Sequence, residues 1–284
     1  MCQRHEVASV GSRSLSALTS APTVWVLRLL WLAAPFTIGA SLADALADTD
    51  RSAQVTVSIG TWVLWGLVLV ASLVPRAATL TPLRIGVPGA AVVAGWAAID
   101  EGVDGTTVVS LVVAAVLVVL SLSPQVGEHF VDGSSYGAER RVTLRPPGPL
   151  LAGPIPVAWL GVVVGVAAGP VMLANHQWIP GVALTLVGYP LAYLLTRALH
   201  RLALRWLVFV PGGLVVHDLL ALDAPVLFER STIVSFGPAP ADSSALDLTM
   251  TAPGLALELV VDRPQKLGPR PRRGGSAELV EATA

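Results

Sequence analysis

Long apolar runs, separated by short polar segments, fill most of the chain before residue 205. They lie at about 23–43, 57–74, 83–99, 106–123, 150–174 and 178–196. A helix needs roughly 20 apolar residues to cross the hydrocarbon core of a bilayer. The third run is short and interrupted by Gly86, Pro88 and Gly89, so it qualifies only if Arg84 extends its side chain to the interface. Runs without a period of two exclude a β-barrel. The pattern therefore predicts six transmembrane helices.

A second pattern begins after Leu204, where apolar and polar residues alternate and turn signals appear. Such alternation is typical of a half-buried antiparallel sheet. The expected strands are Trp206–Val210, Leu214–His217, Ala224–Phe228, Thr232–Phe236, Ala245–Thr251 and Leu255–Val261. Pro211-Gly212 predicts the turn of a hairpin between the first two strands.

These two patterns predict a helical polytopic membrane protein with a small C-terminal antiparallel β domain. The expected order is a disordered tail at 1–22, a six-helix domain at 23–204, a cytoplasmic β domain at 205–262 and a disordered tail at 263–284. A sheet of this size is marginal as an independent domain. We therefore expect it to lean on the membrane or on the loop that contains Arg140.

Composition agrees with a membrane protein, because 54% of the residues are hydrophobic and 13% are charged. Soluble domains carry roughly 25% charged residues. The formal net charge of −1 predicts no nucleic-acid partner. Cys2 is the only cysteine, which excludes an internal disulfide. Lys266 is the only lysine beside many arginines, and with the abundant Ala, Val and Gly this bias indicates a bacterial source.

The charges of the loops predict the orientation of the helices. If the N-terminus is cytoplasmic, the outer loops carry Arg51 and the acids Asp44, Asp48, Asp50, Asp100, Glu101 and Asp104. The inner side then carries Arg4, Arg13, Arg76, Arg84, Arg140, Arg141, Arg145, Arg197, Arg201 and Arg205. Arginine on the cytoplasmic side is the usual bias of membrane proteins. We expect a multi-pass protein of the bacterial inner membrane with both termini in the cytoplasm.

Two groups of residues are candidate contact sites. Arg197, Arg201 and Arg205 recur every four residues and would share one face of a helix. With Arg140, Arg141 and Arg145 of the long inner loop, they form a candidate site for anionic lipid head groups or a partner protein; a topology anchor with salt bridges to Glu139 or Glu128 is the alternative for the loop arginines.

Three glycines in the fifth run form the second group. The ridge Gly161, Gly165 and Gly169 permits close approach of another helix. That helix belongs either to the same chain or to a second copy.

The sequence contains few motifs that are typical of catalytic sites. It has no phosphate-binding loop of the Gly-x4-Gly-Lys type and no Gly-x-Ser-x-Gly nucleophile motif. The histidines have no pair at ligand spacing on a helix, so we expect no metal and no cofactor. Asp100-Glu101-x-x-Asp104 resembles the Asp-rich motif by which prenyl-transferring enzymes hold Mg²⁺ and diphosphate. Its predicted place in a tight outer loop favours an ordinary acidic turn.

The stretch 205–236 reads as an apolar strand, a Pro-Gly turn, Gly-Leu-Val-Val, a further strand and Ser-Thr-Ile-Val-Ser-Phe. This order resembles the first half of the bacterial pleckstrin-homology-like domains that follow transmembrane segments in many small membrane proteins. A full domain of that type ends in a helix, which the pattern after Val261 does not predict. The whole chain is similar to integral membrane proteins of actinobacteria, most clearly in FVDGSSYGAERRVTLRPPGP at 130–149. The resemblance implies a fold and no reaction.

Two functions therefore stay open. The first is a non-enzymatic membrane anchor or scaffold, which presents a cytoplasmic β module to anionic lipid or to a partner protein. The alternative is a transporter or lipid-processing membrane enzyme, with the third span along its pathway. No acid lies inside a span to relay protons, which counts against a secondary transporter.

Overall fold

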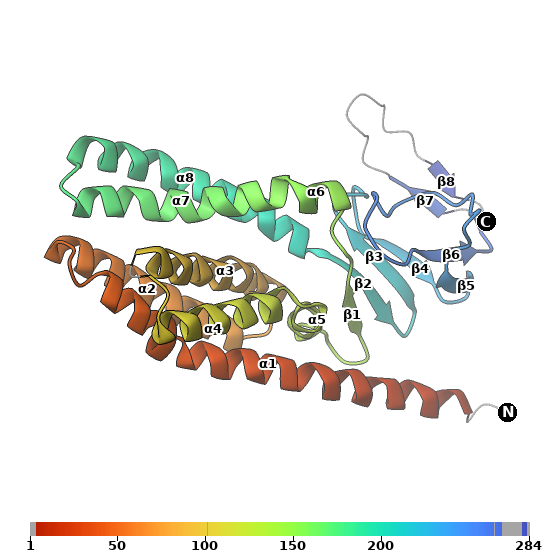
Figure 1. Cartoon of the computed structure of the whole chain (residues 1–284). Coiled ribbons are helices and arrows are strands. Elements are labelled where there is room, and N and C mark those ends of the chain that lie inside the picture. Colours follow the sequence, from red (N-terminus) through yellow and green to blue (C-terminus); the bar gives the residue numbers. More distant parts are fainter. Residues whose placement is uncertain (1–3, 101, 264, 269–279, 283–284) are drawn as a thin grey trace. The chain divides into compact units, whose positions relative to one another are not determined.

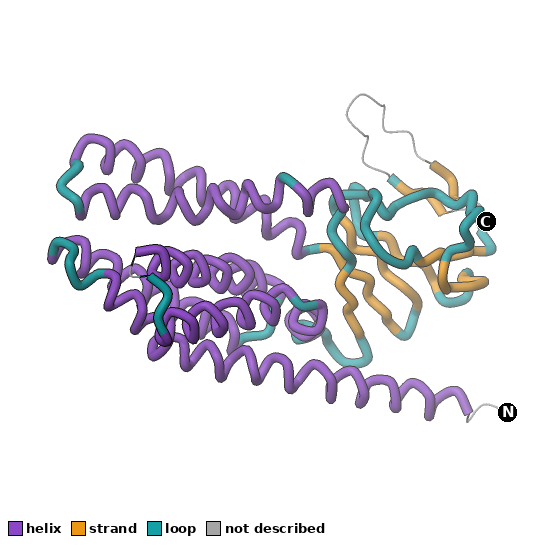
Figure 2. Tube along the Cα trace, viewed as in Figure 1, coloured by secondary structure: helices purple, strands orange, loops and turns teal. Residues whose placement is uncertain are grey.

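The computed structural model describes residues 4–100, 102–263, 265–268 and 280–282 (Figure 1). The chain folds into two compact units. The helical unit comprises residues 1–133 and 160–196, and the β unit comprises residues 134–159 and 197–284. Strands occur in the β unit alone among the described residues, as Figure 2 shows.

Six long apolar helices are confirmed. The helices are α1 (Arg4–Ala45), α2 (Arg51–Leu73), α3 (Ala77–Asp100), α4 (Gly105–Leu122), α5 (Pro124–Asp132), α6 (Gly148–Ala152), α7 (Pro154–Ala174) and α8 (Trp178–Ala203). All except α5 and α6 contain a segment long and apolar enough to cross a membrane, which in α1 begins at Pro22. The expected fifth run is divided at Gly153, because Pro154 cannot continue α6 and instead begins α7.

The third span is an uninterrupted helix of 24 residues, longer than its glycines and prolines suggested. Pro82 and Pro88 lie inside it, and neighbouring helices pack on it. Prolines are tolerated in membrane helices because neighbouring groups satisfy the backbone atoms that they release. Arg84 is not an obstacle either, since it donates to the carbonyl of Ser121 in α4 over 3.4 Å.

The first helix begins at Arg4, inside the segment 1–22 for which a tail was expected. Extending an existing helix adds one hydrogen bond for each residue that is fixed, whereas nucleation is costly. Extending α1 from the apolar segment after Pro22 therefore costs less free energy than starting a separate helix at residues 4–22.

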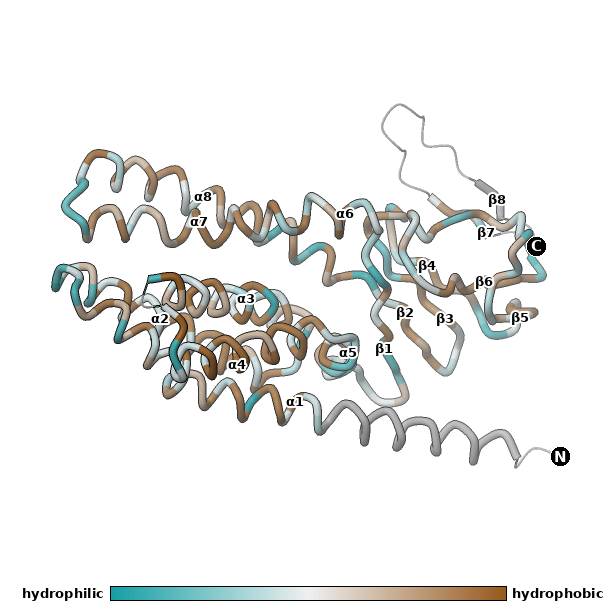
Figure 3. Tube along the Cα trace, in the orientation of Figure 1, coloured by the Kyte–Doolittle hydropathy of each residue, from teal (hydrophilic) through white to brown (hydrophobic). Residues whose placement is uncertain are grey.

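Within the helical unit, α1 and α3 both pack against α4, and α2 packs against α3. The core contains Leu27 and Trp31 of α1, Leu80 and Leu83 of α3, and Leu117 of α4. Many large apolar side chains of α1 to α4 are also exposed, and Figure 3 shows apolar residues along these helices. Large contiguous apolar surfaces are rare on soluble monomers. A helix that is apolar on its core and outer faces alike is typical of a membrane span.

The β unit is built on a four-stranded antiparallel sheet in the order β1-β2-β3-β4. The strands are β1 (Arg140–Thr143), β2 (Arg205–Val210), β3 (Gly213–Asp218) and β4 (Val226–Glu229). Two antiparallel pairs follow, β5 (Ile233–Pro238) with β6 (Leu257–Val261) and β7 (Gln265–Leu267) with β8 (Val280–Ala282). The sheet therefore includes a strand from outside the expected β domain, because the segment between α5 and α6 contributes β1 as the partner of β2.

One expected strand is absent, because Ala245–Thr251 is irregular and ends in a turn. The carboxylate of Asp247 accepts hydrogen bonds from the main-chain nitrogen and the hydroxyl of Thr249, at 2.8 and 2.7 Å. Such local bonds compete with a strand ladder. Met250 and Thr251 follow with φ of 54° and 61°, a conformation that no strand contains.

The hydrophobic core of the β unit contains side chains from several of its strands and loops. It consists of Ala221 and Leu222 after β3, Phe228 of β4, Val261 of β6 and Leu267 of β7, with Met250 and Leu248 packed beside them. Leu267 is only 3% exposed, so the tail expected to begin at 263 in fact contributes to the core.

Candidate functional site

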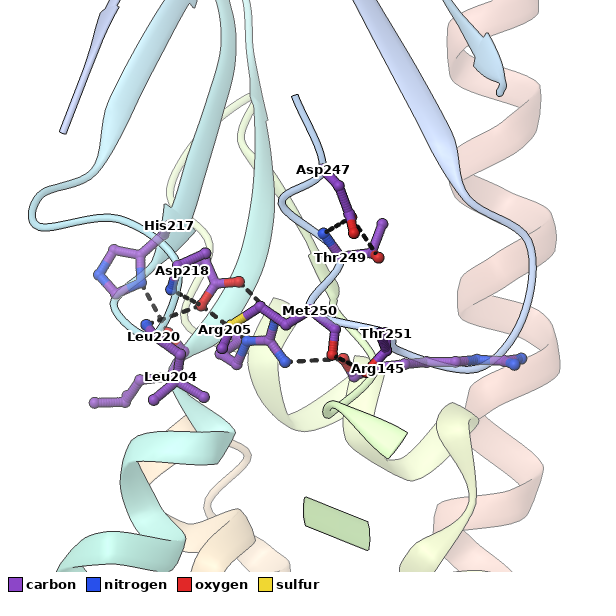
Figure 4. A network of polar contacts seen from close by, with 11 residues as sticks. Arg145, Leu204, Arg205, His217, Asp218, Leu220, Asp247, Thr249, Met250 and Thr251 are labelled. Carbon is purple, nitrogen blue, oxygen red and sulfur yellow. Dashed lines mark hydrogen bonds and ion pairs between the residues drawn. The ribbon is translucent and has the colours of Figure 1, made fainter. Parts of the chain in front are cut away.

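Arg205 and Asp218 form a buried ion pair where the chain passes from α8 into the sheet (Figure 4). They lie opposite each other in the β2–β3 hairpin. Arg205 Nε donates to Asp218 Oδ1 over 2.8 Å, and Nη2 donates to Oδ2 over 2.6 Å. The side chains are 2% and 3% exposed. A guanidinium fork matches a carboxylate in this bidentate way and excludes water from both charges.

Main-chain groups complete the pair. Asp218 Oδ1 also accepts from the nitrogens of Leu220 and Ala221, at 3.0 and 3.4 Å. Arg205 Nη1 donates to the carbonyl of Arg145 over 3.0 Å, and the carbonyl of Arg205 accepts from the nitrogen of Leu144. The pair therefore fastens the segment after β1 to the start of β2.

This placement removes Arg205 from the candidate contact site. Helix α8 ends at Ala203, so Arg205 is the first residue of a strand and does not share a helix face with Arg197 and Arg201. Its guanidinium is enclosed, and its donors are directed to Asp218 and to the carbonyl of Arg145. A spacing of four residues predicts a shared face only while the helix continues.

Arg141 is partly buried in a local cluster. It donates from Nε to Glu139 Oε1 over 3.0 Å, and this bond is the main reason why the pKa of Glu139 lies below its ordinary value. The guanidinium of Arg141 lies 5.8 Å from the ring centre of Trp206, and Trp206 stacks on His217 at 4.6 Å. His217 in turn places Nδ1 2.9 Å from the carbonyl of Leu204. Arg141 thus stabilises the sheet face.

The other four arginines of the candidate set are not enclosed as Arg205 is. Arg145, Arg197 and Arg201 keep exposed or partly exposed side chains, and Arg140 is partly exposed beside Phe209 of β2. Arg145 also donates to the carbonyl of Pro253 over 3.2 Å. All four belong to the β unit, where they form the remaining candidate set for lipid or partner contact.

The glycine ridge of α7 faces α8. A methyl group at Gly165 would lie 2.8 Å from the carbonyl oxygen of Gly188, and one at Gly161 would lie 2.5 Å from the side chain of Leu195. At Gly169 it would collide with Thr185. The two helices therefore approach closely along the whole ridge, and α8 occupies the surface that a second copy would use.

Two arginines inside the helical unit bind the ends of neighbouring helices. Arg28 of α1 donates from Nε and Nη2 to the carbonyl of Ser72, at 3.0 and 2.6 Å. Arg84 makes the equivalent bond to Ser121 near the end of α4. Carbonyls in the last turn of a helix lack intrahelical partners and carry partial negative charge. The sequence could have predicted such contacts, because an arginine inside an apolar span usually pairs with another side chain or with a main-chain carbonyl.

The acidic motif lies at the start of α4. Asp104 caps this helix by accepting from the nitrogen of Thr107, and the Thr107 hydroxyl accepts from the nitrogen of Asp104, each at 2.8 Å. The bond from the Thr107 nitrogen is the main reason why the pKa of Asp104 is lowered. Glu101 lies outside the described residues. No group of three or more potential metal ligands occurs in the part of the chain that the structure describes.

Comparison with known proteins returns no similar family, no similar curated protein and no similar solved structure.

Proposed function

We propose that the chain is an integral protein of a bacterial cytoplasmic membrane that acts as an anchor rather than as an enzyme. Its six long helices would cross the membrane with both termini in the cytoplasm. The β unit would then contact anionic lipid head groups or a partner protein at the inner surface.

The observation that carries this proposal is the position of the exposed and partly exposed arginines. Arg140, Arg145, Arg197 and Arg201 all belong to the unit that contains the sheet, and two of them lie on the last turns of a candidate span. Arginine at the cytoplasmic end of a span can reach lipid phosphates. The fully paired Arg205 and Asp218 hold the start of β2 against β3, directly after those last turns.

The alternative of a transporter or lipid-processing enzyme has less support. Its pathway would need a polar cavity beside α3. A groove between α1, α2 and α3 is instead lined mostly by apolar side chains of α1 and α2, and α3 contributes Ala90 and Val93 to it.

Cysteine accessibility tests the orientation. In a Cys2→Ser background, single cysteines replace Asp48, Asn175 and Gly212, and whole cells are treated with a membrane-impermeant maleimide. Positions 48 and 175 should react in intact cells. Position 212 should react only after permeabilisation. The reverse pattern would contradict the proposed topology.

Lipid retention tests the contact. The full chain, purified in mild detergent, is compared by native mass spectrometry with a variant carrying Gln at positions 140, 145, 197 and 201. The unaltered chain should retain phosphatidylglycerol over phosphatidylcholine, and the variant should lose this preference. Arg230→Gln and Arg263→Gln together remove exposed charge from the same unit outside the candidate set and serve as the control. Equal retention in all three proteins would exclude lipid binding by these arginines and leave a partner protein as the contact.

A further inference from the structure

The helical unit contains a groove of about 310 Å³ between α1, α2 and α3. The lining residues of α1 and of the turn directly after it recur every three or four positions and so lie on one face: Trp31, Ala34, Pro35, Ile38, Gly39, Leu42 and Ala43, followed by Leu46. At 1.5 Å per residue, this face extends for about 22 Å. Gly39 opens the wall, because the nearest atoms to a methyl group placed there would be 3.8 and 3.9 Å away.

The polar atoms of the inner wall are already paired within the protein. Trp31 Nε1 donates to the carbonyl of Trp65 over 3.0 Å, and Trp65 Nε1 donates to the carbonyl of Trp31 over 2.9 Å. The hydroxyl of Thr61 donates to the carbonyl of Val57, one turn earlier in α2. The other two polar side chains of the lining, Ser58 and Trp62, keep exposed surface. Among the described residues that line the groove, none is charged.

Such a wall offers an occupant apolar area and aromatic faces, and few polar atoms with which to orient a polar solute. A sugar or an ion that entered would lose its hydration without gaining partners. A hydrocarbon chain has no such cost and would gain from contact with Trp62 and Trp65, whose rings lie edge to face at 5.4 Å.

We propose that this groove binds one acyl chain of a membrane phospholipid, along the face that runs from Trp31 of α1 to Leu46 in the turn after it. The inference rests on the membrane insertion proposed above, since all three helices that line the groove contain candidate spans. The bilayer supplies hydrocarbon along their whole length, because its apolar core is about 30 Å thick. The occupant is therefore a lipid chain that remains with the protein, and the groove is a site for a structural lipid.

Photo-crosslinking tests the site. The full chain is placed in nanodiscs of phosphatidylcholine that contain a small share of phosphatidylcholine with a diazirine on one acyl chain. After irradiation, labelled residues are mapped by mass spectrometry. Three variants are compared with the unaltered chain: Gly39→Leu fills the groove, Gly39→Ala adds a methyl group that the contacts tolerate, and Gly60→Leu adds the same bulk to an open surface of α2 outside the lining.

The label should concentrate on 34–46 and 58–65 in the unaltered chain, in Gly39→Ala and in Gly60→Leu. Each methylene group kept out of an apolar site lowers affinity about fourfold. If the leucine side chain excludes about two methylene groups, Gly39→Leu should reduce labelling of the groove about 16-fold, while outward positions such as Leu67 stay labelled. Equal labelling of the groove in Gly39→Leu and Gly60→Leu, or no excess over Leu67 in the unaltered chain, would overturn the acyl-chain site alone. Absence of label from all six helices would overturn membrane insertion, and the site with it.

Discussion

Trp65 of α2 donates its indole hydrogen to the main-chain carbonyl of Trp31 over 2.9 Å, and Pro35 is the reason this carbonyl can accept it. In a regular helix, the carbonyl of residue 31 would accept from the nitrogen of residue 35, but proline has no N–H. An unpaired carbonyl inside a bundle costs free energy. Trp65 of α2 therefore donates the hydrogen bond to the carbonyl of Trp31 that Pro35 cannot donate.

Replacing Trp65 by Phe should destabilise the helical unit by about 1–3 kcal/mol, because it leaves the carbonyl of Trp31 without this donor. The loss should be smaller in a Pro35→Ala background, since the main-chain nitrogen at position 35 then carries a hydrogen and can bond that carbonyl. The free energy of unfolding of all four proteins in detergent gives the coupling between the two positions. Equal losses in both backgrounds would show that the bond does not compensate for the proline.

The buried pair in the β unit leads to a second prediction. Arg205→Met should destabilise this unit by about 3–5 kcal/mol, because it leaves the carboxylate of Asp218 buried without its counter-charge. Adding Asp218→Asn should recover part of the loss, since the amide is neutral and its oxygen still accepts from the nitrogen of Leu220. Hydrogen exchange of residues 205–218 in the full chain measures both effects.

Arg230→Met, at an exposed arginine of the same unit, is the control for this pair. It should leave exchange of residues 205–218 unchanged. If the double variant exchanges as fast as Arg205→Met alone, the loss does not come from an uncompensated charge.

The third prediction concerns the glycine ridge. Gly165→Leu should destabilise the α7–α8 hairpin by about 1–3 kcal/mol, because overpacking forces the backbones apart. Gly60→Leu adds the same side chain where no atom lies within 4 Å and should change little. Thermal unfolding and native mass spectrometry are measured together. A change in oligomeric state without a change in stability would instead assign the ridge to contact with a second copy.

The apolar pattern was sufficient to predict the six helices because the length of an apolar run is a local property. The hairpin of β2 and β3 was also predictable from Pro211-Gly212, and the same register continued by one residue pair places Arg205 opposite Asp218. That pairing was therefore within reach of the sequence. The spacing of Arg197, Arg201 and Arg205 gave a wrong prediction for Arg205. A shared helix face would require α8 to continue through residue 205, but the helix ends at Ala203.

The remaining features depend on contacts between distant segments. Strand β1 has only four residues and begins with two arginines, so its position follows from pairing with β2 and not from its own pattern. The bond between Arg28 and Ser72 joins residues that are 44 positions apart. No local periodicity reports such a partner.

The fourth prediction concerns pH. His129 of α5 has a pKa below its ordinary value of 6.5, chiefly because burial disfavours the charged ring, and also because Arg28 of α1 repels a proton there. Asp132 of α5 opposes this shift. The unfolded chain therefore binds a proton at His129 more readily than the folded chain does. Linkage then requires that the folded state lose stability as the pH falls through about 6.5.

The thermal unfolding midpoint of the full chain should accordingly be lower near pH 5.5 than near pH 7.5, and His129→Gln should reduce this difference because glutamine does not titrate. His176→Asn is the matched control, since His176 is exposed and its φ of 61° is one that asparagine tolerates. It should keep the full pH dependence. If His129→Gln keeps it as well, protonation elsewhere in the chain sets the acid sensitivity, and the lowered pKa of His129 is not its cause.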